Sequence, residues 1–353
     1  MNVEHLPTPA LVVDEAILEK NERAMKELLC SSKLSLRPHY KSHKCAALAR
    51  RQIEAGAVGM TCAKLSEAED LAYAGIENIL IANQIVAPDK IARLAHLAKA
   101  CRRTVCVDNE ENINALSRAA QFAGSTLYCL VEYEIGMKRC GVTTHQEVLR
   151  LAKKITESPN LSFEGIQAYA GHISHVVDFE ERRTATERNN ADLRLLLKKL
   201  ANAGLPAHTL SGGSTGSSTL KVKDSPYTEL QAGSYLFMDA TYRDLGLPFE
   251  NSLFVLTTVV SQREGLTVVD AGVKSCGVDQ GMPVCRDHRS GDVTASEEHF
   301  QIAELEGSLS LGDKLYLVPA HCCSTVNLYD CIYVIRDGKV VDRLSVSARG
   351  CFK

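Results

Sequence analysis

The sequence repeats one pattern along its first two thirds, a short β-rich run followed by a stretch with apolar residues at helical spacing. Alternating strands and helices predict a parallel sheet, and eight such units match a closed (β/α)8 barrel of the TIM type. The predicted strands are Leu34–His39, Val58–Cys62, Asn78–Ala82, Thr104–Val107, Leu127–Tyr133, Gly165–Tyr169, His208–Ser211 and Tyr235–Met238. The predicted helices between them include Lys64–Ala74, Asp89–Lys99, Glu111–Phe122, Gln146–Thr156 and Phe179–Ala203.

An open, doubly wound sheet is the alternative architecture. We favour the barrel because the number of strand and helix units reaches eight and because no GxGxxG motif follows the first strand.

The pattern changes after about Gly246, where β-rich runs follow one another without helical spacing between them. This change predicts a mostly antiparallel β domain. An opening strand over Thr8–Asp14 precedes a helix at Ala16–Leu29, and we expect this strand to pair with the second domain. The predicted domains are therefore a barrel over 16–245 and a β domain over 246–353 that includes strand 8–14. The predicted strands of the β domain are Leu253–Ser261, Leu266–Asp270, Lys314–Val318, Cys331–Arg336 and Lys339–Ser345.

Composition excludes several classes of function. A net charge of −3 with mixed signs, few aromatic residues and no Trp argue against a nucleic-acid partner. No apolar run approaches the length of a membrane span, and the first fifteen residues lack the order of a signal peptide. The thirteen cysteines lie mostly in apolar or helical stretches, which is typical of reduced thiols. We therefore expect a cytoplasmic protein that acts on a small molecule.

Lys41 stands out at the end of the first predicted strand, in the polar segment Arg37–Lys44. An ammonium group is costly to desolvate, so burial would lower the pKa of Lys41. Cationic neighbours such as Arg37 and Lys44 would lower this pKa further. A free amine of this kind can form a Schiff base with a carbonyl compound. The alternative is a solvated basic turn with no chemical role.

The loop Ser211–Ser217 lies at the end of the seventh predicted strand and contains Gly212, Gly213, Ser214 and Thr215. Glycines let backbone N–H groups approach an anion, and hydroxyls add donors. Barrels commonly bind phosphate after strands seven and eight. Alone the loop could be a flexible connection, but opposite a strand-end lysine it indicates pyridoxal phosphate.

Two further strand ends offer cofactor contacts. Tyr169, after the sixth predicted strand, could lie beside the cofactor ring or relay protons; the alternative is a structural barrel tyrosine. Arg139, in the loop after the fifth, could pair with the phenolic oxygen of the cofactor; the alternative is a surface arginine.

His321 and Cys323 form a candidate metal site in the β domain. On an extended segment, residues two apart point to the same side, and imidazole with thiolate suits Zn²⁺. Two protein ligands would leave positions for water and substrate. Adjacent cysteines are otherwise typical of a hydrophobic core.

These motifs together resemble the D-threonine aldolase and D-serine dehydratase-like group of pyridoxal-phosphate enzymes, which share the alanine racemase-type fold (fold type III). The resemblance covers nearly the whole chain. Its motifs are Thr8-Pro9-Ala10, Arg37–Lys44, Gly136–Gly141, Gln167–His172, Gly212–Thr215, Gln231–Tyr235 and His321–Cys323.

By position, the resemblance implies that Lys41 is the Schiff-base lysine and that Arg139 lies beside the pyridine ring. Tyr169 matches an active-site tyrosine, and Tyr235 lies in a motif near the cofactor. Gly212, Gly213, Ser214 and Thr215 match the phosphate-binding loop. His321 and Cys323 match the ligands of a divalent metal, expected to be Zn²⁺, with Mn²⁺, Co²⁺ or Mg²⁺ as alternatives. The resemblance also implies a homodimer.

The resemblance implies a lyase of D-3-hydroxy amino acids and leaves its reaction open. Dehydratases carry His-x-Cys and aldolases His-x-Asp, so Cys323 favours dehydration to a 2-oxo acid and ammonia. The residues that follow Cys323 and Tyr235 resemble the aldolases, which release glycine and an aldehyde. An amino-acid racemase needs no metal, and small non-catalytic pyridoxal-phosphate proteins lack the β domain, so both are more remote. D-serine, D-threonine and 3-hydroxy-D-aspartate all remain possible substrates.

Overall fold

The computed structural model describes residues 1–222 and 224–353. The chain forms two compact units, which we call the β unit (residues 1–26, 42–47 and 234–350) and the barrel unit (residues 27–41, 48–233 and 351–353). Each unit gathers separate stretches of the chain that lie close in space. The predicted domain boundary at residue 245, which divides the sequence once, therefore stays a prediction. None of the helices in the described residues is long and apolar enough to span a membrane.

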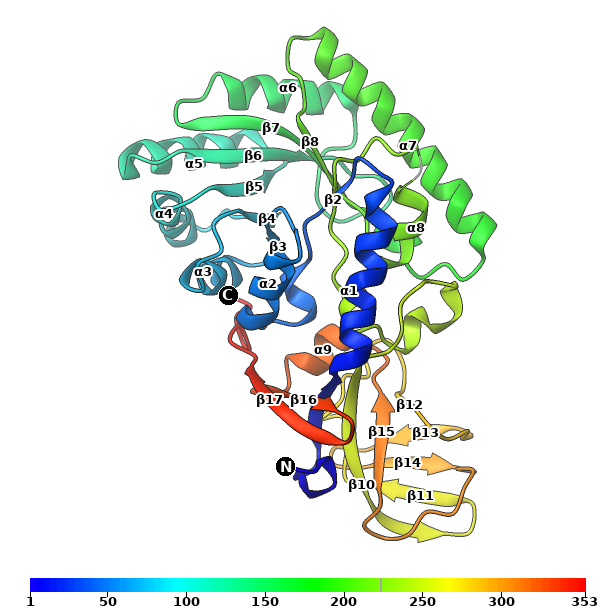
Figure 1. The fold of residues 1–353 in the computed structure, drawn as a ribbon. Coiled ribbons are helices and arrows are strands. Elements are labelled where there is room, and N and C mark those ends of the chain that lie inside the picture. Colours follow the sequence, from blue (N-terminus) through cyan, green and yellow to red (C-terminus); the bar gives the residue numbers. More distant parts are fainter. Residues whose placement is uncertain (223) are drawn as a thin grey trace. The chain divides into compact units, whose positions relative to one another are not determined.

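The barrel unit contains a sheet of eight parallel strands in the order β2-β9-β8-β7-β6-β5-β4-β3. A bridge between His39 and Thr61 joins the two ends of this order, and the N–H of Thr61 donates to the carbonyl of Pro38 over 2.8 Å. The predicted TIM-type barrel is therefore confirmed (Figure 1). Its strands are β2 Ser35–Leu36, β3 Met60–Cys62, β4 Ile79–Gln84, β5 Arg103–Val107, β6 Leu127–Glu132, β7 Leu161–Ala168, β8 Thr209–Gly212 and β9 Glu229–Leu230.

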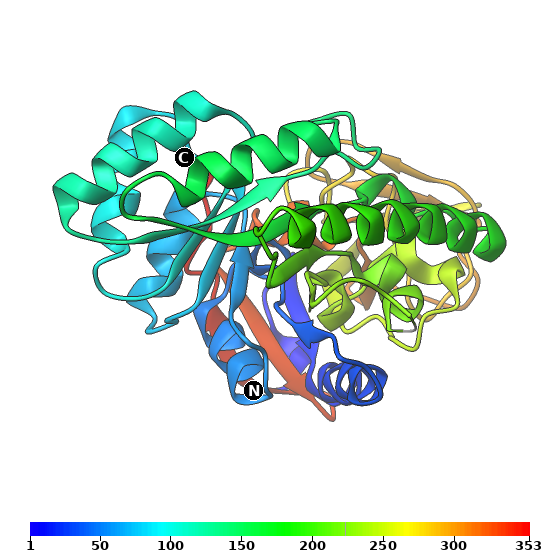
Figure 2. The ribbon, with the colours of Figure 1, turned by 90° about the horizontal axis from the view of Figure 1, so that it is seen from above.

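The helices of this unit form because their apolar residues recur along one face. In α6 (His145–Thr156), the buried residues Val148, Leu151 and Ile155 follow helical spacing, and Thr144 with Glu147 forms a capping box at the start. The helices lie on the outer side of the strands, as the blue-to-green part of Figure 2 shows. The others are α3 Leu65–Tyr73, α4 Pro88–Leu97, α5 Glu110–Ala123, α7 Phe179–Asn202 and α8 Ser218–Lys221. Two helices, α1 Glu15–Cys30 and α2 Ala46–Glu54, contain residues of both units.

The β unit is built on a nine-stranded, mostly antiparallel sheet. As predicted, the opening strand β1 (Ala10–Asp14) joins this sheet, antiparallel to β10 and parallel to β16. Buried Val12, Phe254 and Ile335 pack together in its core. The other strands are β10 Leu253–Arg263, β11 Leu266–Val269, β12 Val284–Cys285, β13 Val293–Ala295, β14 Phe300–Ala303, β15 Lys314–Val318, β16 Cys331–Arg336 and β17 Lys339–Ser345.

One predicted strand is wrong. Tyr235–Met238, predicted as the eighth barrel strand, overlaps the short 3-10 helix η5 (Ser234–Leu236), and the eighth strand is β9 instead. The carbonyl of Ser234 accepts the N–H groups of Phe237 (3.1 Å) and Met238 (2.6 Å), and Met238 has a left-handed backbone with φ of 53°. These hydrogen bonds fold Tyr235–Met238 into a tight turn, and this turn is buried.

Candidate functional site

A cavity of about 150 Å³ opens within the barrel unit where several parallel strands end. Gln84 is the last residue of β4 and Glu132 the last of β6, while Tyr169 directly follows β7. Barrel enzymes place their catalytic groups at this end of the strands. The cavity is lined by His39, Lys41, Ala63, Ala82, Asn83, Gln84, Glu132, Arg139, Cys140, Gln167, Tyr169 and Gln231.

Three residues predicted from the sequence meet at this cavity. Lys41 lies in the 3-10 helix η2 (Tyr40–Ser42), and its backbone N–H donates to Nδ1 of His39 over 3.3 Å. The Lys41 ammonium lies 6.0 Å from the centre of the Tyr169 ring, and the Arg139 guanidinium lies at the same distance of 6.0 Å. Two cationic groups therefore flank one phenol.

The position of Tyr169 depends on Gly171. A Cβ atom on Gly171 would lie 2.7 Å from Cε1 and 2.9 Å from the phenol oxygen of Tyr169, so any other residue there would displace the Tyr169 ring. Tyr40, which precedes Lys41, is fully buried, and its hydroxyl donates to Asp70 on α3. The backbone around both candidate residues is thus fixed by packing.

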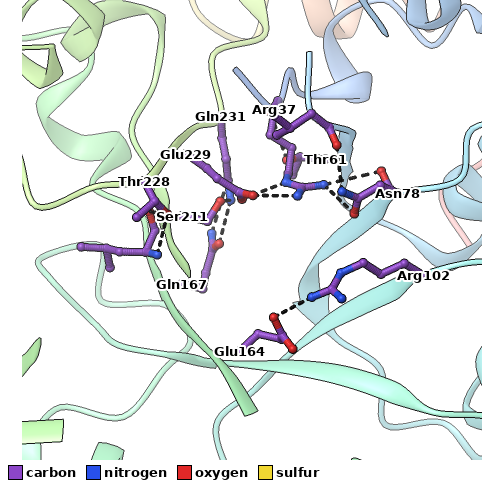
Figure 3. A network of polar contacts seen from close by, with 12 residues as sticks. Arg37, Thr61, Asn78, Arg102, Glu164, Gln167, Ser211, Thr228, Glu229 and Gln231 are labelled. Atoms are coloured by element: carbon purple, nitrogen blue, oxygen red, sulfur yellow. Dashed lines mark hydrogen bonds and ion pairs between the residues drawn. The ribbon is translucent and has the colours of Figure 1, made fainter. Parts of the chain in front are cut away.

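Arg37, expected as a cationic neighbour of Lys41, is held elsewhere. Its guanidinium forms a two-pronged ion pair with Glu229, with distances of 2.8 and 2.7 Å, and it also donates to Asn78 over 3.1 Å (Figure 3). The charge of Arg37 is therefore balanced by Glu229 on β9. Lys44, the other expected neighbour, belongs to the β unit.

Glu132 and Gln84 are cavity residues that the sequence analysis did not select. Nε2 of Gln84 donates to Oε2 of Glu132 over 2.6 Å. Burial raises the pKa of Glu132, although the Gln84 hydrogen bond and the charge of Arg139 oppose the shift. Oε1 of Gln84 is buried and has no hydrogen-bond partner among the described residues, so an acceptor is left for a bound molecule. Their positions at strand ends could have identified both residues.

Two further glutamines form a network on another side of the cavity. Nε2 of Gln231 donates to Oε1 of Gln167 over 2.7 Å and to the hydroxyl of Ser211 over 2.9 Å. Figure 3 shows this network beside the Arg37–Glu229 ion pair. Gln167 and Gln231 belong to motifs of the family resemblance, but no role was assigned to them from the sequence.

The predicted phosphate loop is closely packed. A Cβ atom on Gly212 would lie 2.0 Å from the carbonyl oxygen of Ala168, and one on Gly216 would lie 1.8 Å from that of Ser174, so only glycine fits. The Ser214 hydroxyl accepts a 2.6 Å hydrogen bond from Ser174, and Thr215 is 1% exposed. The loop is therefore closely packed against neighbouring backbone. The loop residues are not among those that line the cavity, so their contact with phosphate stays a prediction.

Tyr235 belongs to the β unit. Its ring is 2% exposed and packs on Phe249 with 5.7 Å between ring centres. Its predicted place near the cofactor stays a prediction.

The candidate metal ligands lie at the start of helix α9 (Cys322–Val326) in the β unit. The extended segment assumed from the sequence is wrong: His321 is the N-cap, and Cys323 lies in the first turn because Thr325 donates twice to the carbonyl of His321. The side chains nevertheless meet, since Cys323 hydrogen-bonds to the His321 ring. Burial lowers the pKa of His321, but the hydrogen bonds and charges of Cys323 and Asp279 outweigh it and raise the pKa to about 9.

The surroundings of the thiols differ. The Cys323 sulfur lies 3.9 Å from the hydroxyl of Ser42, the residue that follows Lys41 in the chain. Cys322 is fully buried, with its sulfur 3.7 Å from the Ser234 hydroxyl and 4.0 Å from that of Cys323. Within the described residues, no group of three or more His, Cys, Asp or Glu side chains is arranged to hold a metal ion.

The residues present fit the groups implied by the sequence. The barrel cavity offers a primary amine that can react with an aldehyde, and a guanidinium and a phenol that can bind anionic oxygens. In the β unit, an imidazole and a thiol in contact suit a Zn²⁺-like ion with open positions.

Comparison with known proteins gives matches over the whole chain. The family described as "Alanine racemase, N-terminal domain" matches residues 13–241, and a serine dehydratase domain matches residues 252–335. A D-threonine aldolase from Arthrobacter sp is 40% identical, over 97% of this chain and 93% of that protein.

Two other relatives bear on fold and reaction. The crystal structure of D-threonine aldolase from Filomicrobium marinum superposes with a TM-score of 0.95 at 39% identity and covers 99% of this chain and 98% of its own. A D-threo-3-hydroxyaspartate dehydratase from Delftia sp. is 28% identical over 91% of this chain and 92% of its own length.

Proposed function

Since this chain belongs to the alanine racemase-type family of pyridoxal-phosphate enzymes, and to its lyases of D-3-hydroxy amino acids, we propose that it is an aldolase. It would cleave the bond between the α- and β-carbons of a D-3-hydroxy amino acid and release glycine and an aldehyde. The observation that carries this choice is the identity of 40% with an aldolase, against 28% with a dehydratase. The dehydration favoured from Cys323 alone becomes the second candidate.

Lys41 would hold the cofactor, since it contributes the primary amine among the described residues that line the cavity. Pyridoxal phosphate supplies an electron sink for negative charge at the α-carbon of the amino acid. Arg139 would bind an anionic oxygen of the cofactor, and its distance of 6.0 Å from the Tyr169 ring leaves room for another group beside the phenol. The backbone of Gly212–Thr215 would bind the phosphate.

His321 and Cys323 would hold one divalent ion, which we propose to be Zn²⁺, with Mn²⁺, Co²⁺ or Mg²⁺ as alternatives. Such an ion acts as a Lewis acid toward a hydroxyl oxygen. Retro-aldol cleavage requires loss of the hydroxyl proton from the 3-position. Dehydration requires loss of the α-proton and departure of the same hydroxyl as hydroxide.

One specific observation supports the second candidate. The second metal position carries a thiol, Cys323, where the aldolase pattern has a carboxylate. A thiolate donates more charge to a borderline ion than a carboxylate does, and this changes how strongly the ion polarises a hydroxyl. The dehydratase reading therefore predicts a 2-oxo acid and ammonia from the same substrates.

We further propose a homodimer in the cytoplasm that acts on a small D-amino acid without a nucleic-acid or membrane partner. Light scattering of the purified protein measures directly whether it is a homodimer.

Product analysis tests the reaction. The holoenzyme is incubated with D-threonine, D-threo-3-hydroxyaspartate or D-serine, and glycine, aldehyde, 2-oxo acid and ammonia are quantified. We expect glycine and aldehyde in equal amounts. A 2-oxo acid and ammonia in equal amounts would establish the dehydratase, and racemised substrate without either product pair would exclude both lyases. L-Threonine is the matched control substrate.

A further inference from the structure

Asp279 lies in the β unit between β11 and β12, and its carboxylate contacts helix α9 at two points. Oδ2 lies 2.6 Å from Nδ1 of His321, and Oδ1 accepts a 2.5 Å hydrogen bond from the hydroxyl of Ser324. One carboxylate thus binds both the imidazole ring and the helix that carries Cys323.

The segment before Asp279 is fixed against the same helix. The N–H of Gly277 donates to the hydroxyl of Thr325 over 3.0 Å, and that hydroxyl donates to the carbonyl of His321 over 2.9 Å. A Cβ atom on Gly277 would lie 2.1 Å from the Ser324 hydroxyl oxygen, so the close approach requires glycine. Asp279 therefore meets His321 from a backbone that is itself held on α9.

An imidazole has two ring nitrogens, and the hydrogen bond made by one decides which is left for a metal. Metal-binding histidines commonly donate the other ring N–H to a carboxylate, which fixes the ring and makes it a stronger donor. Here Asp279 engages Nδ1, so Nε2 is the nitrogen left for an ion.

We propose that Asp279 is a positioning residue, which holds the His321 ring so that Nε2 faces the ion and which is not itself a ligand. The inference rests on the proposed metal site. Both carboxylate oxygens already have protein partners, and the described residues contain no cluster of three ligands that would include Asp279. Because the Asp279 side chain is 50% exposed, its role is one of geometry and hydrogen bonding more than of charge.

The test measures Zn²⁺ affinity by competition with a chromogenic chelator on the pyridoxal-phosphate-loaded protein. Asp279→Ala should weaken Zn²⁺ binding by about 10- to 100-fold, the usual effect of losing such a partner. Asp279→Asn keeps an acceptor oxygen and should have an intermediate affinity. Ser324→Ala is the matched control, because it removes the other hydrogen bond of the same carboxylate, together with a 3.3 Å contact to the His321 carbonyl, and leaves the contact between Asp279 and the His321 ring. Its affinity should stay within about threefold of that of the unchanged protein.

A second readout separates positioning from folding and from failure of the site itself. With Co²⁺ in place of Zn²⁺, the absorption of a cobalt–thiolate bond reports Cys323, and Asp279→Ala should bind Co²⁺ more weakly while keeping this band at saturation. Equal losses of affinity in Asp279→Ala and Ser324→Ala would overturn the proposal, since the helix and not the ring would then be responsible. An unchanged affinity in Asp279→Ala with a large loss in His321→Ala would overturn it too. If His321→Ala and Cys323→Ala also bind Zn²⁺ unchanged, the metal site itself is wrong.

Discussion

The ammonium of Lys41 lies 6.0 Å from the centre of the Tyr169 ring, although the two residues belong to different strand ends of the barrel. Lys41 follows β2 and Tyr169 follows β7, which are separated in the sheet by β9 and β8, so the side chains meet across the curved sheet and not along one strand pair. A lysine that lies near a phenol and lines a cavity is a suitable place for a carbonyl cofactor.

Lys41 should carry pyridoxal phosphate covalently, because it is the amine that faces the cavity. The purified protein should absorb visible light, and borohydride should fix the cofactor on the peptide that contains Lys41. Lys41→Ala should lose both signals, whereas Lys44→Arg should keep both. A fixed label on Lys44, or no absorption after incubation with the cofactor, would contradict this assignment.

Ser214→Ala combined with Thr215→Ala should weaken cofactor binding without loss of the covalent link at saturation. Each lost hydrogen bond to a phosphate costs roughly 1.5–3 kcal/mol, which corresponds to about 10- to 150-fold in affinity per hydroxyl. Titration of cofactor-free protein measures the change, and Ser225→Ala is the control from outside the loop. Unchanged affinity in the double variant would leave this loop with a structural role only.

Removal of divalent ions should abolish turnover of D-3-hydroxy amino acids and leave the visible absorption of the cofactor intact, because Lys41 and not His321 would hold the cofactor. Turnover should return with added Zn²⁺. Cys323→Asp should shift the preference toward harder ions such as Mn²⁺ or Mg²⁺. Cys322→Ala should change little, because the Cys322 thiol is buried against Ser234. Full activity after chelation would exclude the metal mechanism.

The fold followed from the sequence wherever a strand was apolar and its helix was amphipathic. β16 and β17 begin and end at the predicted residues, and α6 begins one residue earlier than predicted. The prediction of the eighth strand was wrong for two reasons. Tyr235–Met238 has the composition and the burial of a strand but forms a turn, and the actual eighth strand, β9, is only two residues long. Composition cannot separate a buried turn from a buried strand.

The site was predicted in part, for a similar reason. Lys41, Arg139 and Tyr169 have side chains with evident chemistry, and they meet at one cavity. Glu132 and Gln84 also lie at strand ends, but their hydrogen bond to each other and the burial that raises the pKa of Glu132 are seen only in the folded chain. Asp279 lies 42 residues before His321 in the chain, so no local sequence pattern predicts the contact between them.

Lys221 gives a prediction about pH and stability. Its side chain is 3% exposed; its ammonium donates to Oδ1 of Asn190 over 3.2 Å and lies 3.9 Å from the centre of the Tyr227 ring. Burial lowers the pKa of Lys221 from 10.5 to about 7. Below pH 7 the folded and unfolded chains both carry the proton, and the folded chain bears the full cost of the buried charge.

Between about pH 7 and pH 10.5, the unfolded chain binds a proton that the folded chain lacks, so unfolding takes up a proton and stability rises with pH. At about 1.36 kcal/mol for each pKa unit, the cost at pH 7 is at most about 5 kcal/mol.

Lys221→Met removes this cost and leaves the amide oxygen of Asn190 without its partner, which costs about 1–3 kcal/mol. We therefore expect a net gain of roughly 3 kcal/mol in the free energy of unfolding at pH 7, and about zero at pH 9.5. Denaturant unfolding of the cofactor-free protein at both pH values measures the difference, and the exposed Lys198→Met is the control, expected to change by less than about 0.5 kcal/mol. A gain that is equal at both pH values would mean that Lys221 carries its proton in the folded protein as it does in the unfolded chain, so that burial does not lower its pKa.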